Sequence, residues 1–383
     1  MIGVVSKPDI QEKLEILSAD AQYDLACACG TREDEHRKRG EGGKWIYPVS
    51  LPNGGTSVLF KTLMSNVCSN DCKYCPLRAG SDVRRCSLVP EEVVKVFLDY
   101  YNRGEVFGLF LSCGVCGSAD GTMEKLNRVA RILRQREKYR GYIHLKVIPG
   151  ASDAAIEEAV RLSTAVSLNI EVPGAKHLAK LSAKKDYMKD IIEPIKLISR
   201  LTGRGARYER VKQTTQFIVG AAGETDTEIV KYMWGLYDRL DLQRVYFSAY
   251  QKGLGDKSLA GGVEKEVRQA SMSDVFMREH RLYQADFLLR KYGFKDGDIL
   301  FEKGGNLSLE YDPKEAWAKS HPEAFPVDVN RAGYYQLLRV PGLGPVTVKG
   351  ILERRKQARI KDIEDVGKVG ARLGKAREYV VFG

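Results

Sequence analysis

Three cysteines near residue 70 have the residue type and the spacing of an iron–sulfur ligand set. Cys68, Cys72 and Cys75 follow the pattern Cys-x3-Cys-x2-Cys, with the aromatic Tyr74 directly before the last of them. A [4Fe–4S] cluster normally takes four thiolates, so three thiolates on one loop leave one iron open to bind a small molecule. A zinc knuckle or a closed four-cysteine cluster is the alternative, but no cysteine or histidine follows closely enough to complete a local zinc site.

This loop resembles the cluster loop of the radical S-adenosylmethionine (SAM) superfamily, in which the free iron binds the amino and carboxylate groups of SAM. The apolar run at residues 58–64 stands where that superfamily has a strand. The resemblance implies a [4Fe–4S] cluster held by the three cysteines, SAM as cofactor with Tyr74 at its site, and a 5′-deoxyadenosyl radical that abstracts hydrogen from the substrate. It also implies an external electron donor such as flavodoxin or ferredoxin.

The composition is typical of an intracellular enzyme with two or three domains. The chain has 383 residues, a formal net charge of +11 and eight cysteines, and this cysteine usage favours a reducing compartment over a disulfide framework. No apolar run approaches the roughly 20 residues needed to cross a bilayer, and residues 1–15 lack a signal-peptide apolar stretch. We therefore expect a cytoplasmic protein without a membrane partner.

The middle of the chain alternates β-rich runs with helical patterns, which predicts parallel βα units. The expected strands are residues 58–64, 108–112, 142–148, 165–171, 213–219 and 244–250. The expected helices between them are residues 90–103, 123–138, 153–162 and 190–201. These units predict an α/β fold, a partial (β/α)6 TIM-type barrel such as the superfamily resemblance implies.

Four of the six expected strands carry polar side chains, although parallel strands covered on both faces usually read as apolar runs. Because side chains alternate across a strand, the polar set should line the lumen, where an ordinary barrel packs branched apolar residues. An exposed sheet edge would explain the pattern in any single strand. We expect the substrate side of the cavity to be lined by His144, Lys146, Tyr246 and Tyr250.

Glycine-bearing turns follow several of these strands at the end where barrel enzymes place their chemistry. By resemblance to the superfamily, Ser112 and Gly114 match the motif that holds the SAM amino group. Asn169 and Glu171 match the position that contacts the ribose, and Gly220 matches the turn beside the adenine. A glycine turn is usually only a turn, but these turns follow the cluster loop in the expected order.

From residue 325 the sequence changes character. Residues 330–355 read as a helix, a tight Pro-Gly-Leu-Gly hairpin and a second helix, and a degenerate second hairpin follows at residues 363–372. This resembles a tandem helix-hairpin-helix module, in which glycines let backbone N–H groups form an anion nest and a helix N-terminus faces a phosphate. Residues 330–383 carry 12 Lys and Arg against 5 Asp and Glu. A helical protein–protein module with a solvated basic face is the alternative.

The expected nucleic-acid contacts of this all-helical domain position a phosphate backbone without reading bases. They are Gly342, Gly344, Thr347, Lys349, Arg354 and Arg355. Residues 278–293 predict an amphipathic helix that ends at a glycine and closes the open side of the barrel. The expected domains are an N-terminal extension (1–55), the barrel (56–260), a helical connector (261–325) and the helix-hairpin-helix domain (326–383).

Nearly the whole chain is similar to one narrower family of radical SAM proteins, described as acting in DNA modification or repair and encoded beside a uracil-DNA-glycosylase-like protein. The resemblance implies such a protein as a partner. This chain departs from the family pattern at Cys113 and Cys116, where a serine and a non-cysteine residue are expected. The resemblance rests on residues 23–27, 108–112, 141–146, 215–226, 244–249, 279–285, 325–332 and 338–342.

Cys113 and Cys116, with Cys27 and Cys29, have the number of thiols for a second cluster or a zinc ion. The alternative is that they are small buried apolar residues. Because Cys113 and Cys116 depart from the family pattern, we favour a protein with one cluster.

These observations predict a radical SAM enzyme that modifies or repairs a nucleic acid, DNA in preference to RNA, and a duplex base would have to be extruded to reach the cavity. RNA modification by the same chemistry is the first alternative. The second is a DNA-binding protein with a structural cluster, but such clusters have four cysteines close to the hairpin. Here the loop has three and lies far upstream of it. The sequence does not name the target atom or the product.

Overall fold

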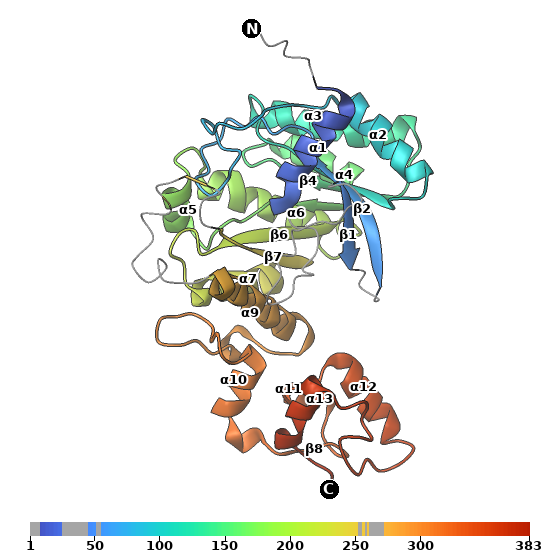
Figure 1. Ribbon diagram of the computed structural model, residues 1–383, viewed down its shortest axis with the longest axis vertical. Coiled ribbons are helices and arrows are strands. Elements are labelled where there is room, and N and C mark those ends of the chain that lie inside the picture. Colours follow the sequence, from blue (N-terminus) through green and yellow to red (C-terminus); the bar gives the residue numbers. More distant parts are fainter. Residues whose placement is uncertain (1–7, 25–44, 51–54, 252–254, 257–258, 260–271) are drawn as a thin grey trace, which may run out of the picture. The chain divides into compact units, whose positions relative to one another are not determined.

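The central sheet follows the order of the sequence (Figure 1). The computed structural model describes residues 8–24, 45–50, 55–251, 255–256, 259 and 272–383. The first two strands pair antiparallel, and each later strand of this sheet pairs in parallel with the one before it. The strands are β1 (Ile46–Ser50), β2 (Thr56–Leu63), β3 (Gly108–Ser112), β4 (Tyr142–Lys146), β5 (Ala165–Ser167), β6 (Lys212–Val219) and β7 (Arg244–Ala249). The expected α/β fold with parallel βα units is confirmed.

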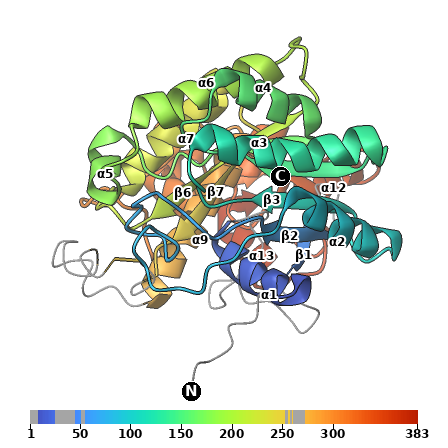
Figure 2. The same ribbon diagram turned by 90° about the horizontal axis from the view of Figure 1, so that it is seen from above.

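Amphipathic helices connect the parallel strands. They are α2 (Pro90–Asn102), α3 (Ala119–Arg131), α4 (Asp153–Leu162), α5 (Ala175–Leu181), α6 (Glu193–Thr202) and α7 (Asp226–Leu240). In α2, Pro90 occupies the first turn, where its missing N–H costs nothing, and Val93 and Phe97 share the buried face at helical spacing. Figure 2 shows α2, α3, α4 and α6 one after another along the outside of the sheet, where each packs on the next.

The N-terminal segment takes part in this sheet, which the sequence did not predict. The helix α1 (Ile10–Asp20) packs against β2, and a 3-10 turn at Ala21–Tyr23 follows it. In β1, Tyr47 and Val49 are buried in one cluster with Leu59 of β2 and Phe110 of β3. The antiparallel strand therefore covers apolar side chains beside the first parallel strand.

The chain forms two compact units. The first runs to Glu224 and includes Gly235–Glu279, and the second contains Thr225–Trp234 and His280–Gly383. The predicted amphipathic helix is present as α9 (Met272–Lys291). In the first unit, its Glu279 accepts a hydrogen bond from the backbone N–H of Ala249 at 2.6 Å. None of the described helices is long and apolar enough to cross a bilayer.

Short helices around an apolar core make up the C-terminal part of the second unit. The core includes Leu337, Leu338, Val348 and Ile351. The helices are α10 (Pro313–Ser320), α11 (Tyr334–Arg339), α12 (Pro345–Arg354) and α13 (Ala371–Gly374), with a 3-10 turn at Lys375–Tyr379.

Two expectations for this part were wrong. It is not all-helical, because β8 (Val327–Asp328) pairs in parallel with β9 (Val380–Val381) and joins the start of the domain to its end. The expected second hairpin has no first helix, since residues 361–370 form turns and bends and lead into the four residues of α13. The glycines at 367 and 370 suit turns and offer no side chain to pack a helix.

Candidate active site

A cavity opens at the C-terminal ends of the parallel strands in the first unit. The last residues of β2, β3, β4 and β7 line it, and so do Gln216 and Ile218 near the end of β6. Parallel strands bring their C-terminal ends to one edge, which is where barrel enzymes place their catalytic groups.

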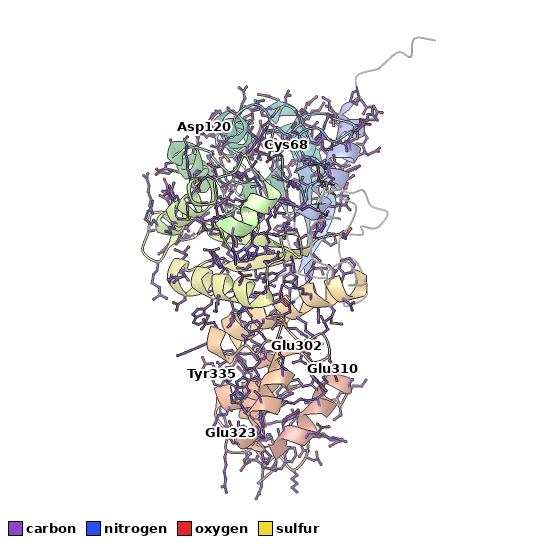
Figure 3. The ribbon with its side chains drawn as sticks, turned by 90° about the vertical axis from the view of Figure 1, so that its left-hand side faces the viewer. Cys68, Asp120, Glu302, Glu310, Glu323 and Tyr335 are labelled. Atoms are coloured by element: carbon purple, nitrogen blue, oxygen red, sulfur yellow. The ribbon has the colours of Figure 1, made fainter. Side chains whose placement is uncertain are left out.

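All three cysteines of the motif line this cavity, and none of them forms a disulfide. Figure 3 labels Cys68 on the loop that follows β2. Burial raises the pKa of the Cys72 thiol although Lys185 opposes the shift. Burial and the neighbouring Cys72 raise the pKa of Cys75 to about 12. Three thiols on one loop that line one cavity are a donor set that fits an iron–sulfur cluster.

The cluster loop is not arranged for a single ion. Within the described part of the chain, no three His, Cys, Asp or Glu side chains surround a position for one metal ion. A cubane cluster binds each thiolate to a different iron, so its ligands need not converge on one point. The backbone of the loop turns tightly, because Cys75 N donates to Cys72 O at 2.9 Å and Leu77 N donates to Cys75 Sγ at 3.4 Å.

The turn after β3 lies directly against the cluster loop. Gly114 N donates to Ser65 O at 2.7 Å, and Ser69 N donates to Val115 O at 2.9 Å. A Cβ atom on Gly114 would lie 2.4 Å from the carbonyl oxygen of Val67, so only glycine allows this approach. Ser112 and Gly114, which were expected at the SAM amino group, line the cavity.

The segment after α5 holds the cluster loop from another side. Lys73 N donates to Leu181 O at 2.8 Å. The carboxylate of Asp71 accepts hydrogen bonds from Ser182 Oγ at 2.5 Å and from Ala183 N at 2.9 Å. The exposed Lys184 donates to Ser69 O at 2.6 Å. The bonds of Leu181, Ser182 and Ala183 to the cluster loop fix the backbone that leads to Lys185.

Lys185 was not predicted from the sequence, and it lies inside the cavity wall. Its Nζ is 3.6 Å from Glu171 Oε1, and only 7% of the Lys185 side chain and 6% of the Glu171 side chain are exposed. Burial lowers the pKa of Lys185, but the charges of Cys72 and Glu171 outweigh burial and raise it overall. Burial, together with the charge of the Glu171 carboxylate, raises the pKa of Tyr74.

Glu171 has a backbone conformation that non-glycine residues rarely adopt, with φ of 65°. Its Oε2 atom is buried and has no hydrogen-bond partner. An outlier of this kind costs free energy and is often found at a functional site. Glu171 and Asn169, which were expected at the SAM ribose, both line the cavity.

A second charged pair lies at the end of β4. Lys146 Nζ is 2.6 Å from Asn169 Oδ1 and 3.0 Å from Asp24 Oδ1. Burial raises the pKa of Asp24, but Lys146, the hydroxyl of Ser112 and Lys61 together lower it below its usual value. Asp24 and Asp20 both line the cavity, so the N-terminal segment contributes two acidic residues that sequence reasoning missed.

Three predicted residues do not line the cavity: His144, Tyr246 and Gly220. His144 is buried in the wall, where its Nε2 is 2.8 Å from Ser167 Oγ and its Nδ1 is 3.2 Å from Tyr142 Oη. Burial, with the charge of Lys146, lowers the pKa of His144 to about 3. His144 therefore supports the wall as a neutral side chain. Tyr250 does line the cavity.

Gly220 begins a turn that is held within the first unit. It has φ of 86°, and its N–H donates to the carboxylate of Glu224. The positive φ is reason enough for a glycine at this position, and no contact with a ligand is needed to explain it.

The hairpin residues of the second unit divide into structural and exposed positions. Gly342 has φ of 88°, and a Cβ atom there would lie 2.3 Å from the carbonyl oxygen of Arg372. Arg355 donates to Ala332 O at 2.7 Å. Lys349 and Arg354 are exposed.

Gly344 precedes α12 with φ of −111°, at the N-terminus of that helix. Thr347 is partly buried in the first turn of α12. Six residues were expected to contact nucleic acid. Four of them lie at the surface of the hairpin, namely Gly344, Thr347, Lys349 and Arg354.

The four cysteines weighed as ligands of a second cluster or a zinc ion are only partly described. Cys27 and Cys29 lie outside the described residues. Cys113 lines the cavity, and burial together with Cys116 raises its pKa to about 12.

Comparisons with known proteins identify the domain that carries this cavity. Residues 62–233 match the family model of the Radical SAM superfamily. The structure of the FeFe-hydrogenase maturase HydG from Carboxydothermus hydrogenoformans is similar with 16% identity and a TM-score of 0.45, over 60% of this chain and 51% of that one. Methylornithine synthase (PylB) is similar with 12% identity and a TM-score of 0.45, over 60% of this chain and 63% of that one. This chain thus spans less than two thirds of either protein. The comparison with curated proteins finds no match.

Proposed function

We propose that this chain, which has a radical SAM domain at residues 62–233 and is therefore an enzyme using a [4Fe–4S] cluster and SAM, acts on a nucleic acid, DNA in preference to RNA. The enzyme class and the cofactors follow from the domain. The nucleic-acid substrate is the part that needs an argument, and it rests on the hairpin of the second unit.

Cys68, Cys72 and Cys75 would hold the cluster, since they line one cavity and share one tight loop. The bound cluster would pass an electron from an external donor to SAM and so generate a 5′-deoxyadenosyl radical. Ser112, Asn169 and Glu171 line the same cavity, and their polar groups would orient the cofactor.

On the substrate side, Lys146 and Tyr250 remain candidates, and Asp24 joins them because it lies 3.0 Å from Lys146. An ammonium with a carboxylate partner offers both a donor and an acceptor to the edge of an extruded base. The buried setting keeps bulk water from the reacting carbon, which a radical intermediate requires.

The observation that carries the nucleic-acid proposal is the turn between α11 and α12. A left-handed glycine at 342 turns the backbone, and α12 starts directly behind it with exposed Lys349 and Arg354 along its length. A helix N-terminus of this kind favours an anion, and the basic side chains add sequence-independent affinity for phosphates. A uracil-DNA-glycosylase-like partner would act on the same DNA.

The test is an anaerobic incubation of the reconstituted full-length protein with SAM and dithionite. Duplex DNA, single-stranded DNA and RNA are supplied in parallel, and nucleosides are analysed by mass spectrometry. We expect 5′-deoxyadenosine in every reaction and a new nucleoside with DNA. Replacing the three motif cysteines with alanine should abolish cluster binding and 5′-deoxyadenosine together.

The outcomes separate the parts of the proposal. A modified nucleoside from RNA alone would make RNA the substrate. An unchanged nucleoside pool with all three nucleic acids, despite SAM cleavage, would remove nucleic acid as the substrate. SAM cleavage by the triple cysteine variant would refute the assignment of the cluster ligands.

A further inference from the structure

One positively charged side chain of the cavity carries a charge that acts on a cysteine of the cluster motif. Among the described residues that line the cavity, the cations are Lys146 and Lys185. Lys146 is held by Asp24 at 3.0 Å and by Asn169 at 2.6 Å. Lys185 instead lies 3.6 Å from Glu171 Oε1 and interacts electrostatically with Cys72. The two lysines therefore have different roles in the cavity.

The surrounding backbone places Lys185 firmly. Leu181, Ser182 and Ala183 each form a hydrogen bond with residues 71–73 of the cluster loop. Lys185 follows two residues later, with 7% of its side chain exposed. Solvent screening of its charge is weak at such a site, so a nearby change of charge interacts with it more strongly than at the surface.

We propose that Lys185 sets the reduction potential of the iron–sulfur cluster. One-electron reduction, [4Fe–4S]2+ plus an electron from the external donor to [4Fe–4S]1+, adds negative charge to the cluster and to its thiolate ligands. The adjacent ammonium of Lys185, which is buried in the same cavity wall, stabilises the reduced state. Hydrogen bonds to the sulfurs and net charge are the variables that set such potentials. Lys185 therefore makes the cluster easier to reduce.

Glu171 has the opposite effect. Its carboxylate lies 3.6 Å from Lys185 and interacts electrostatically with Cys72. A negative charge beside the ligand disfavours the added electron, so Glu171 lowers the potential that Lys185 raises. Lys185 and Glu171 therefore act on the reduction potential in opposite directions. Removing the charge of one should shift the potential with the opposite sign to removing the charge of the other.

This inference rests on the proposed function, because it takes Cys72 as a cluster ligand. The test is an EPR-monitored redox titration of reconstituted full-length protein in the absence of SAM. The midpoint potential should fall in Lys185→Met and in Lys185→Gln, which both remove the charge, and rise in Glu171→Gln. The double variant Lys185→Met with Glu171→Gln should return toward wild type.

Lys184→Met is the matched control. It removes a neighbouring lysine that is exposed and bonds to a backbone carbonyl of the cluster loop. Its midpoint potential should equal that of wild type, because solvent screens an exposed charge. If the midpoint potential fell as much in Lys184→Met as in Lys185→Met, the proposal would be overturned. The loss of any nearby positive charge would then be enough to lower the potential.

The remaining outcomes are equally decisive. An unchanged midpoint in Lys185→Met with full iron content overturns the proposal. Weaker SAM binding with an unchanged midpoint would make Lys185 a residue that anchors SAM, and this also overturns it. If Lys185→Met leaves Glu171 unpaired and loses the cluster, Glu171→Gln and the double variant decide by the sign of their shifts. Full iron and an unaltered EPR signal in Cys72→Ala would refute the ligand assignment instead, whatever Lys185 does.

Discussion

An added methyl group should destabilise the protein at Gly342 but leave its stability unchanged at Gly344, although both glycines belong to one turn. Gly342 has φ of 88°, and a Cβ atom added there would meet the carbonyl oxygen of Arg372 at 2.3 Å and the amide nitrogen of Ala376 at 3.2 Å. Both atoms belong to the backbone, so no side-chain rotation relieves the contact. Gly344 has φ of −111°, and a Cβ there would only touch Tyr292 Oη at 3.4 Å.

The size of the difference follows from these geometries. Left-handed backbone costs a non-glycine residue about 1–2 kcal/mol, and overpacking a core contact costs about 1–3 kcal/mol. We therefore expect Gly342→Ala to lower the free energy of unfolding by about 2–5 kcal/mol. Gly344→Ala should stay within about 0.5 kcal/mol of wild type, as surface substitutions usually do.

The assay is urea unfolding of the full-length variants, with hydrogen–deuterium exchange of peptides from residues 330–383 to locate the loss. The same two variants are titrated with duplex DNA at several salt concentrations. Gly344→Ala should bind DNA more weakly at unchanged stability, because its methyl group stands where a phosphate would approach the helix. Wild-type stability of Gly342→Ala would refute the packing argument. Wild-type DNA affinity of Gly344→Ala would refute the phosphate site.

Three further predictions concern other residues. After replacement of the three motif cysteines, the protein should hold no metal, and stoichiometric metal that is lost only on replacing Cys113 and Cys116 would reveal a second site. Arg354→Ala should reduce the slope of log K against log salt by about 0.9, whereas Arg355→Ala should lower stability by about 1–3 kcal/mol because buried acceptors lose their donor. Because His144 has a pKa of about 3 in the folded protein and about 6.5 when unfolded, unfolding takes up a proton in this interval. Thermal stability should therefore fall as the pH drops from 6.5 toward 3, and less so in His144→Gln.

The strands were predictable where their signal is local. The run at 108–112 became β3 with the expected limits, and residues 153–162 became α4. The strand expected at 165–171 ends at Ser167 instead. The positive φ of Glu171 and the isolated bridge between Glu171 and Phe217 show that the chain bends after this point. No residue propensity indicates that a glutamate adopts a left-handed backbone conformation. The sequence pattern therefore predicted a strand longer than the one observed.

The candidate site was predictable only where the spacing of residues along the sequence indicates their chemistry. Cysteine spacing is local, and the loop lies at the cavity as expected. Asp24 and Lys185 acquire their roles through contacts with distant residues, Lys146 and Glu171. In the sequence, Lys185 is one of two consecutive lysines, a pattern typical of a solvated turn. The polar strand faces indicated Lys146 correctly but also indicated His144, which is buried in the wall.

The two ion pairs of the cavity are better explained by a role in function than by a contribution to stability. Lys146 pairs with Asp24, and Lys185 pairs with Glu171, with all four side chains largely shielded from water. Desolvation can cost a buried pair more than its attraction returns, and an apolar pair of similar volume often stabilises a protein as well or better. Stability alone therefore does not explain charges at these positions. A charged cofactor and an anionic cluster do, because both need fixed charges that are already oriented before binding. On this argument, replacing either pair with apolar residues should leave the fold intact and remove SAM binding or cluster reduction.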